Sequence, residues 1–415
     1  MVSGDSVGSS VRASKALQRL WSLSEGKRVA TLFAVAILFY SILMLAMVAT
    51  DFGGVLVAEY SDEAVRTHPD VRHYQERTQG ILDGKIPYLD FYSESPPLIM
   101  YMMVPAALMG NTLEAYAVLF TAYVFLTAGL LYALLRNRDE KAAFLITAVF
   151  LLNPITWATA VIFVQDETVV ALFYALPVLL LMLGRAQGAA LVATVGALTK
   201  VFSAVLVPLA LVKQSASELK RSIVLLLAAV AVVGVPLLLL AGERFLRFPR
   251  YYLRQTGEEG LQEGITLWVV LYENGVTVPG ILLQALFVLG TLFCLYLIWR
   301  RDIDSVRGAY LMILPFFLFF PKIYACYFII PLAAVCILAV VDRRQVWLLT
   351  VAAFLAFFVQ FFQSYDGVPP MLPADGMWAL IPIGLGLAWQ GIMLYMGVRM
   401  LRSEDHAFLR SPQGR

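Results

Sequence analysis

The chain has 415 residues, of which 60% are hydrophobic and 14% are charged, and its mean hydropathy is +0.78. This composition excludes an ordinary soluble globular protein, and the formal net charge of +2 gives no support for a nucleic-acid partner. Apolar runs of about 20 residues, the length of a helix that crosses a bilayer, recur along the chain. We therefore predict an all-α polytopic membrane protein.

Residues 1–27 form a polar, basic tail ahead of the first long apolar run at 29–50. Within the tail, 13–23 suits either a short amphipathic helix on the membrane surface or a disordered segment. Because the tail lacks the pattern of a cleavable signal, we expect 29–50 to remain as the first membrane span. The positive charge of the tail predicts a cytoplasmic N-terminus and places the next segment, 51–112, outside.

A shorter apolar stretch, 98–109, lies in this first outer loop and contains Pro105. At roughly 1.5 Å per residue it does not cross about 30 Å of hydrocarbon, so we predict a helix that dips into the outer leaflet. A short second span is the alternative. Two other half-length segments, 188–199 and 201–212, meet at Lys200 and are predicted to run up and back.

The remaining segments are predicted to alternate across the membrane. They are 113–135, 142–164, 168–184, 222–240, 278–299, 309–320, 324–341, 346–362 and 378–400. The transmembrane domain, 28–400, then has about twelve membrane segments, with a second long outer loop at 241–276 and a cytoplasmic tail at 401–415. This topology puts every short arginine-rich turn on the cytoplasmic face, as the positive-inside rule favours.

Ionisable side chains from distant segments meet on the outer face under this topology. Such groups are costly to bury at a membrane and therefore mark candidate functional sites. Lysine and arginine neutralise phosphate, and an aspartate can take a proton from an attacking hydroxyl, so the combination suits chemistry on a phosphate-bearing lipid. The residues concerned are Asp70, Glu94, Asp166, Glu167, Lys200, Arg254 and Lys322.

These residues also have structural interpretations. Asp70 suits the N-cap of a helix over 71–83, and Asp166 suits the start of a later helix, where a negative charge is favourable. The Lys200 side chain can extend toward lipid headgroups. Arg254 has several acids nearby in the sequence and can form a plain ion pair with one of them.

Histidines and cysteines give no sign of a metal site. His68 and His73 lack the further ligands that zinc needs. The three cysteines lie in apolar runs without a C-x-x-C pair, so we predict buried, reduced thiols at Cys294, Cys326 and Cys336.

Three motifs in the first outer loop carry a family resemblance: D-x-x-x-Y at 70–74, L-x-G-x-x-P-Y-x-D at 82–90 and E-x-P-P-L at 94–98. The loop resembles that of the GT-C superfamily, polytopic glycosyltransferases that use polyprenyl-phosphate sugars. The likeness is strongest to glycolipid mannosyltransferases, including the first mannosyltransferase of GPI synthesis and bacterial polyprenol-dependent mannosyltransferases. GPI-type members carry D-x-D, whereas His68 stands at the upstream position here, which argues against a two-carboxylate metal grip.

Further resemblance follows in the same order along residues 29–340. The segments concerned are 153–154, 164–166, 198–208, 251–268 and 321–331. Val164 stands where glycine is common in the family, and Tyr252 stands where histidine is common. The resemblance implies a GT-C fold with a helical first outer loop.

By this resemblance Asp70 would be the general base of an inverting transfer. It would deprotonate an acceptor hydroxyl, which attacks C1 of the sugar while polyprenyl phosphate leaves. The pair Asp62–Glu63 is the alternative base, because D-E after the first span is typical of the aminoarabinose and protein-O-mannosyl branches of the superfamily.

The resemblance also implies roles for the other charged residues. The leaving phosphate would be held by Lys200, Arg254 and Lys322. Acceptor hydroxyls, or a divalent cation where one is used, would be bound by Glu94, Asp166 and Glu167. Tyr88 and Tyr252 complete the predicted substrate-binding set.

The sequence therefore predicts a plasma-membrane hexosyltransferase, with mannose preferred, that uses a polyprenyl-phosphate sugar and a glycolipid or lipid-linked acceptor on the outer face. A secondary transporter or lipid flippase is the main rival. Transporters commonly show inverted repeats and midplane charges on discontinuous helices. No repeat is evident in the sequence. A third interpretation is a non-catalytic subunit of a glycosylation complex.

Overall fold

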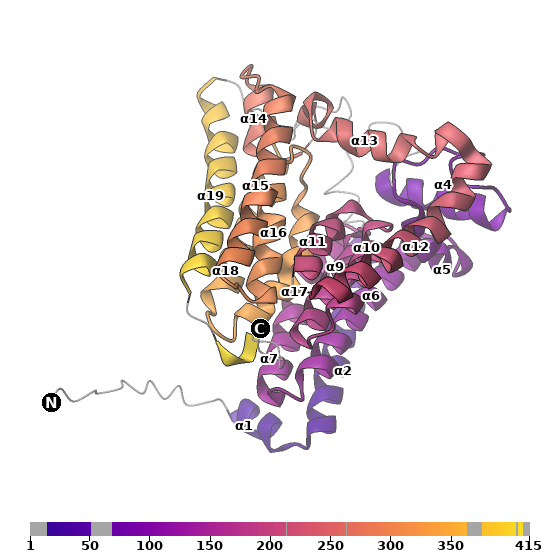
Figure 1. Cartoon of the computed structure of the whole chain (residues 1–415). Helices are drawn as coiled ribbons and strands as arrows, with labels where there is room; N and C mark the ends of the chain where they lie inside the picture. The colour runs from indigo at the N-terminus through magenta and orange to yellow at the C-terminus, as the bar shows by residue number, and fades with distance from the viewer. Residues whose placement is uncertain are drawn as a thin grey trace.

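Figure 1 shows a computed structural model of the chain, which describes residues 15–50, 69–212, 214–262, 264–362, 376–403 and 406–409. Over these ranges the chain is built from helices, and one isolated β-bridge joins Pro87 to Phe91. The predicted all-α fold is confirmed. The alternative base, Asp62–Glu63, and also His68 lie outside the described residues.

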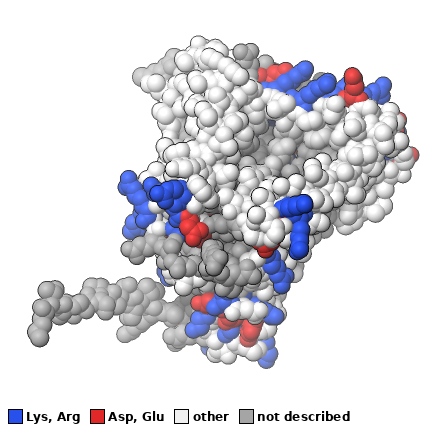
Figure 2. Space-filling view, in the orientation of Figure 1, with Lys and Arg blue, Asp and Glu red and all other residues white. Residues whose placement is uncertain are grey.

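Five of the described helices are long and apolar enough to cross a membrane. They are α2 (Glu25–Thr50), α6 (Leu113–Leu135), α12 (Ala216–Ala241), α15 (Gly280–Arg300) and α19 (Leu380–Arg402). Their outward faces are apolar: on α12, Leu239 is 80% exposed and Val232 is 75% exposed. In Figure 2 charged side chains gather along the upper edge and in the lower part, with a broad uncharged surface between them. Lipid suits such a surface, so the chain is an integral membrane protein.

The segment predicted as one span at 142–164 is instead a bent pair of helices. After α7 (Glu140–Leu152) the chain turns by 49° into α8 (Pro154–Trp157) and the π-helical turn η1 (Ala158–Ile162). Pro154 has no N–H to donate, and its ring disfavours helical geometry at the preceding residue, so α7 ends there. The Asn153 side chain then accepts a hydrogen bond from the Ile155 amide at 2.9 Å and caps the new start.

The short helices predicted in the N-terminal half are present. The stretch 98–109 forms α5 (Pro97–Leu108), and the half-length segments on either side of Lys200 form α10 and η2–α11. The Leu98 amide donates to the Leu198 carbonyl at 2.9 Å, which holds the start of α5 beside the end of α10. The other helices in this half are α1 (Lys15–Ser22), α4 (Pro69–Leu82), α9 (Glu167–Met182), α10 (Ala186–Ala197), η2 (Val201–Val205) and α11 (Leu206–Val212).

The segment 241–276, predicted as a long loop, contains short helices. Of these, α13 lies along the upper edge of the molecule in Figure 1, near α4. The helices of this segment are η3 (Gly242–Arg244), α13 (Arg247–Gln255), η4 (Glu258–Gln262) and α14 (Leu267–Glu273). An amphipathic helix such as α13, which carries three arginines and two tyrosines, suits a position at the edge of a bilayer.

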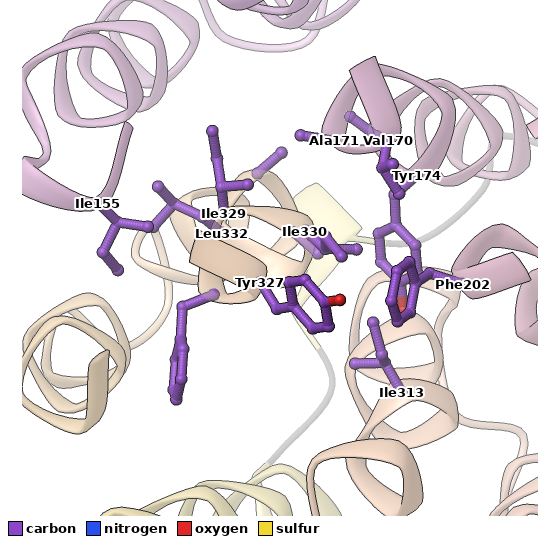
Figure 3. Packing of buried hydrophobic residues seen from close by; sticks show 14 of the residues in the cluster. Ile155, Val170, Ala171, Tyr174, Phe202, Ile313, Tyr327, Ile329, Ile330 and Leu332 are labelled. Carbon is purple, nitrogen blue, oxygen red and sulfur yellow. The ribbon is translucent and has the colours of Figure 1, made fainter. Parts of the chain in front are cut away.

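The core is centred on one wholly buried helix, α17 (Ile329–Leu338). Figure 3 shows Ile329, Ile330 and Leu332 of this helix among side chains from neighbouring helices. All three cysteines are buried and free, as predicted. The other helices of this half are α16 (Ser305–Phe319), η5 (Ala325–Phe328), α18 (Arg344–Gln360), η6 (Gly376–Ala379) and η7 (Ala407–Leu409).

Candidate functional site

The predicted base, Asp70, lies in the first turn of α4 and is joined to a segment 95 residues further along the chain. The Gln165 side-chain amide donates to Asp70 Oδ2 at 2.8 Å. This hydrogen bond brings the D-x-x-x-Y motif of the first loop together with the Q-D pair that precedes α9. Two motifs that were recognised separately in the sequence therefore form one site.

An unusual backbone turn at Val164 places the Gln165 side chain within hydrogen-bond distance of Asp70. Val164 has φ +48°, a left-handed conformation that is strained for a β-branched residue and easy for glycine. The π-helical turn η1 ends two residues before Val164, and the backbone N–H of Gln165 donates to the Thr159 carbonyl of this turn at 3.0 Å. Both features are enriched at functional sites. Val164 occupies the position where glycine is common in the family that the sequence resembles, and its backbone conformation is one that favours glycine.

The next two residues bind Lys200. The Lys200 ammonium donates to Asp166 Oδ1 at 2.7 Å and also to Glu167 Oε1. Glu167 is fully buried and Asp166 is 4% exposed, so the ion pair lies inside the protein. Lys200, which the resemblance assigns to the leaving phosphate, is thus bound to two carboxylates. We call Asp70, Gln165, Asp166, Glu167 and Lys200 the carboxylate cluster.

A close approach of two helical segments positions Lys200. The Lys200 amide donates to the Gly196 carbonyl at 2.8 Å, and after Lys200 the chain returns as η2. A Cβ atom at Gly196 would stand 2.7 Å from the Ser203 side chain and 2.8 Å from the Cβ of Phe173. Such contacts are shorter than packed carbon atoms allow. A glycine is therefore required for α10 and η2 to come together around Lys200.

Aromatic side chains enclose the carboxylate cluster. The Lys200 ammonium lies 5.5 Å from the centroid of the Tyr327 ring and 5.9 Å from that of Phe202, and Figure 3 shows these two rings. Burial raises the pKa of the Tyr74 phenol well above its ordinary value, and the nearby Asp166 and Asp70 carboxylates raise it further. Tyr74 thus stays protonated beside the cluster and is available as a hydrogen-bond donor.

Two neighbouring tyrosines of α13, Tyr251 and Tyr252, have rings in edge contact, and each is related to a different predicted site residue. Burial raises the pKa of the Tyr252 phenol, the Lys200 charge lowers it and the Asp166 charge raises it, so Tyr252 is within electrostatic range of the cluster. The adjacent Tyr251 hydroxyl accepts a hydrogen bond from the Lys322 ammonium at 3.1 Å. Two of the predicted substrate-binding residues, Tyr252 and Lys322, are therefore on the cluster's side of the molecule.

The sequence analysis did not single out Arg77, which binds the predicted substrate residue Glu94. Its guanidinium donates to both Glu94 carboxylate oxygens, at 2.6 and 2.7 Å, and to the Ser95 hydroxyl at 3.2 Å. Burial is the largest single influence and raises the pKa of Glu94, but the Arg77 charge and the hydrogen bonds to the carboxylate together outweigh it and leave the pKa below its ordinary value of 4.5. The spacing of Asp70, Tyr74 and Arg77 at i, i+4 and i+7 places all three on one face of α4, a signal that was present in the sequence.

Two other predicted substrate residues, Tyr88 and Arg254, have contacts that are structural. Tyr88 is 4% exposed, donates to the Ser95 carbonyl at 2.6 Å, and packs against Phe245 and Phe248. It has φ +66° and so forms part of the turn itself. Arg254 has a side chain that is 69% exposed and lies 3.7 Å from Glu259, the plain ion pair considered from the sequence. No described contact joins Arg254 to the carboxylate cluster.

The charges of the carboxylate cluster do not balance. Asp70, Asp166 and Glu167 contribute three carboxylates, and Lys200 contributes one ammonium. Among the described residues the buried Glu167 Oε2 has no hydrogen-bond partner. The same residues contain no group of three or more His, Cys, Asp or Glu side chains arranged to hold a metal ion. The cluster is therefore suited to accept a proton or a hydroxyl donor.

Comparison with known proteins adds no relative to this description. No protein-family model matches the chain, and a search of curated proteins finds no match. The interpretation of the site consequently depends on its own residues and geometry.

Proposed function

We propose that the protein is a GT-C-type membrane glycosyltransferase that transfers a hexose, preferably mannose, from a polyprenyl-phosphate donor to a glycolipid or lipid-linked acceptor. The hydrogen bond between Gln165 and Asp70 carries this proposal, because it joins two of the resembling motifs in one place. The enclosure of this site by tyrosines and its position at the ends of α9 and α10 also support a reaction at the edge of the bilayer.

In the proposed reaction Asp70 is the general base. Gln165 holds Oδ2, and in the described part of the chain no hydrogen bond reaches Oδ1, so this oxygen is available to take the proton of an acceptor hydroxyl. The acceptor oxygen then attacks C1 of the sugar and the C1–O bond to the phosphate breaks, with inversion at C1. An oriented base of this kind contributes about 100- to 10,000-fold to rate.

The leaving phosphate needs positive charge on the far side of the sugar. We assign this role to Lys322, one of the three cations that the resemblance gives it, because its ammonium donates to the hydroxyl of Tyr251 on the same helix as Tyr252. Asp166 and Glu167 then act on the acceptor side and hold Lys200 in place. We propose further that this end of the protein faces outward from the plasma membrane and that the chain has about twelve membrane segments; the positive-inside distribution of the sequence supports the orientation.

A transfer assay tests the proposal. The purified protein receives polyprenyl-phosphate mannose with a labelled sugar and a membrane glycolipid extract, and label in the glycolipid fraction is followed over time. Asp70→Asn keeps the size of the side chain and its bond to Gln165 but removes the base, so transfer should fall by about 100-fold or more.

Asp83→Asn is the matched control. Asp83 lies just beyond the other end of α4 and binds Gln79 at 2.9 Å on the exposed surface, so its loss should leave transfer unchanged. Wild-type transfer by the Asp70→Asn protein would remove the mechanism. Equal losses in the two variants would show that α4 is needed only for folding.

A transporter or lipid flippase is the second candidate, and one observation favours it. The buried ion pair of Lys200 lies at the break between two half-length helices, an arrangement common in transporters. Proteoliposomes with a fluorescent polyprenyl phosphate discriminate the two. Movement of this lipid across the bilayer without glycosyl transfer, equal in wild type and Asp70→Asn, would favour transport.

A further inference from the structure

A cavity of about 370 Å³ lies at the other end of the helices, away from the carboxylate cluster. It is bounded by the end of α17, the start of α18 and the end of α19, so it opens where these helices reach the membrane edge. Its apolar wall includes Leu338, Val341, Met400 and Leu409. A cavity of this size is large enough for a small ligand or a lipid headgroup.

Most charges in the cavity wall are already neutralised. Arg399 donates to Asp342 Oδ2 at 2.6 Å, and Gln345 donates to the same oxygen at 3.2 Å. Arg307 binds Asp304 and donates to the Ser403 carbonyl at 2.6 Å. These contacts hold the side chains of the wall in place. Polar groups of the wall outside these pairs can bind a ligand in the cavity.

Two polar groups in the wall, the side-chain oxygen of Gln345 and the guanidinium of Arg402, lack a partner among the described residues. Gln345 is 4% exposed, and its buried Oε1 has no hydrogen-bond partner among the described residues. A buried acceptor of this kind costs free energy unless a donor reaches it. Arg402 is exposed at the cavity, and no ion pair with it is found in the described ranges. The cavity thus offers one acceptor for a hydroxyl and one guanidinium for an anion.

We propose that this cavity binds the headgroup of an anionic phospholipid that bears a hydroxyl, as in phosphatidylglycerol. The phosphate lies at Arg402, the headgroup hydroxyl donates to Gln345 Oε1, and the acyl chains follow the apolar surface of the neighbouring helices. Basic pockets between membrane helices commonly recognise anionic lipid headgroups in this way. The site is separate from the carboxylate cluster and does not depend on glycosyl transfer.

Native mass spectrometry of the full chain from nanodiscs tests the proposal. Nanodiscs made of equal parts phosphatidylglycerol and phosphatidylcholine should yield a chain that retains one phosphatidylglycerol in preference to phosphatidylcholine. Arg402→Ala should lower that retention about fivefold. Arg343→Ala removes the same charge from the same membrane edge but does not line the cavity, so it should leave retention unchanged.

The hydroxyl is tested with phosphatidylmethanol, an anionic phospholipid whose headgroup has no hydroxyl. The wild-type chain should retain phosphatidylglycerol about fivefold better than phosphatidylmethanol, and Gln345→Leu should retain the two equally. Because Arg402 is exposed, Arg402→Ala keeps the test decisive even where Gln345→Leu fails to fold. Equal retention of phosphatidylcholine, or an equal loss in Arg343→Ala, would overturn the proposal. Displacement of the lipid by excess soluble glycerol 1-phosphate would do the same, since it would assign the site to a soluble phosphate ester.

Discussion

Ion pairs at the two ends of the helices are built differently. At the cluster end, one ammonium, Lys200, is shared between two carboxylates, and their side chains are 15%, 5% and 1% exposed. At the other end, Arg399 and Asp342 form a one-to-one pair whose side chains are 34% and 24% exposed. The Lys200 group, with two carboxylates, is desolvated and has an excess of negative charge. The Arg399–Asp342 pair has balanced charges and is partly exposed to water.

The difference indicates which of the two ion-pair groups is unfavourable for folding and is therefore not present for the sake of stability. A balanced, partly exposed pair adds at most about 1 kcal/mol and anchors the helices where they reach the membrane edge. Desolvated carboxylates in excess of cations oppose folding unless the remaining partners are supplied. Natural sequences keep such arrangements mainly at functional sites. This contrast, rather than the number of charges, singles out the carboxylate cluster.

Removing the cation from each end gives the largest expected difference. Lys200→Met leaves Asp166 and Glu167 buried together without a counter-charge and should lower the free energy of unfolding by about 3–5 kcal/mol. Arg399→Ala should lower it by less than about 1 kcal/mol, because Asp342 is still hydrated. Denaturant unfolding of both proteins in the same detergent measures the two changes.

A charge-removal control shows whether the excess of carboxylates is the cause. In Lys200→Met combined with Asp166→Asn and Glu167→Gln, the buried charges are gone, and most of the lost stability should return. If the triple variant stays as unstable as Lys200→Met, the Lys200 side chain is needed for packing, and the contrast between the two ends loses its electrostatic explanation.

The Arg77–Glu94 pair combines a buried cation with a partly exposed carboxylate, and it sharpens the comparison through pH. Its side chains are 8% and 28% exposed, and Glu94→Gln should lower the free energy of unfolding by about 2 kcal/mol at neutral pH. Because the pKa of Glu94 is lower in the folded protein, the pair stabilises the fold above about pH 4.5 and loses this effect as pH falls through the folded-state pKa.

Unfolding of wild type and Glu94→Gln should therefore be followed from neutral pH downward. The gap between the two should stay constant to about pH 4.5 and close below it. A gap that persists unchanged at pH values below the folded-state pKa would show that the carboxylate charge is not what stabilises this loop.

How much of this could be read from the sequence differs between the fold and the site. Helix α6 has the bounds predicted for it, and the two half-length helices meet at Lys200 as expected, because apolar run length and punctuating residues are local signals. The bend after α7 was also signalled locally, by Pro154, but a run of apolar residues hid it. Hydropathy reports where a chain is apolar and says little about where it bends.

Site contacts were less accessible because they join distant segments. Nothing in the neighbourhood of Gln165 specifies Asp70 as its partner, since the contact depends on the left-handed Val164 and the π-helical turn before it. Lys200 was recognised as unusual, but its partners were not identified. Arg254 was assigned to the site because it belongs to a motif that resembles the family. The motif does not determine where the side chain points, and in the structure it is exposed and lies beside Glu259.

The smallest expected effect compares one substitution at both ends of α10. Gly196 lies at the cluster end, where an added methyl group would stand 2.7 Å from Ser203, so Gly196→Ala should cost about 1–2 kcal/mol of unfolding free energy and separate η2 from α10. Gly188 lies at the other end, where the methyl group would meet only Leu180 at an ordinary 3.7 Å. Gly188→Ala should stabilise the helix by a few tenths of a kcal/mol and at most about 1 kcal/mol, because alanine has the higher helix propensity and Gly188 lies in the first turn. Unfolding measured side by side decides the matter: opposite signs would show that α10 is packed tightly only where it positions Lys200, whereas equal changes would mean that the tight packing has nothing to do with the cluster.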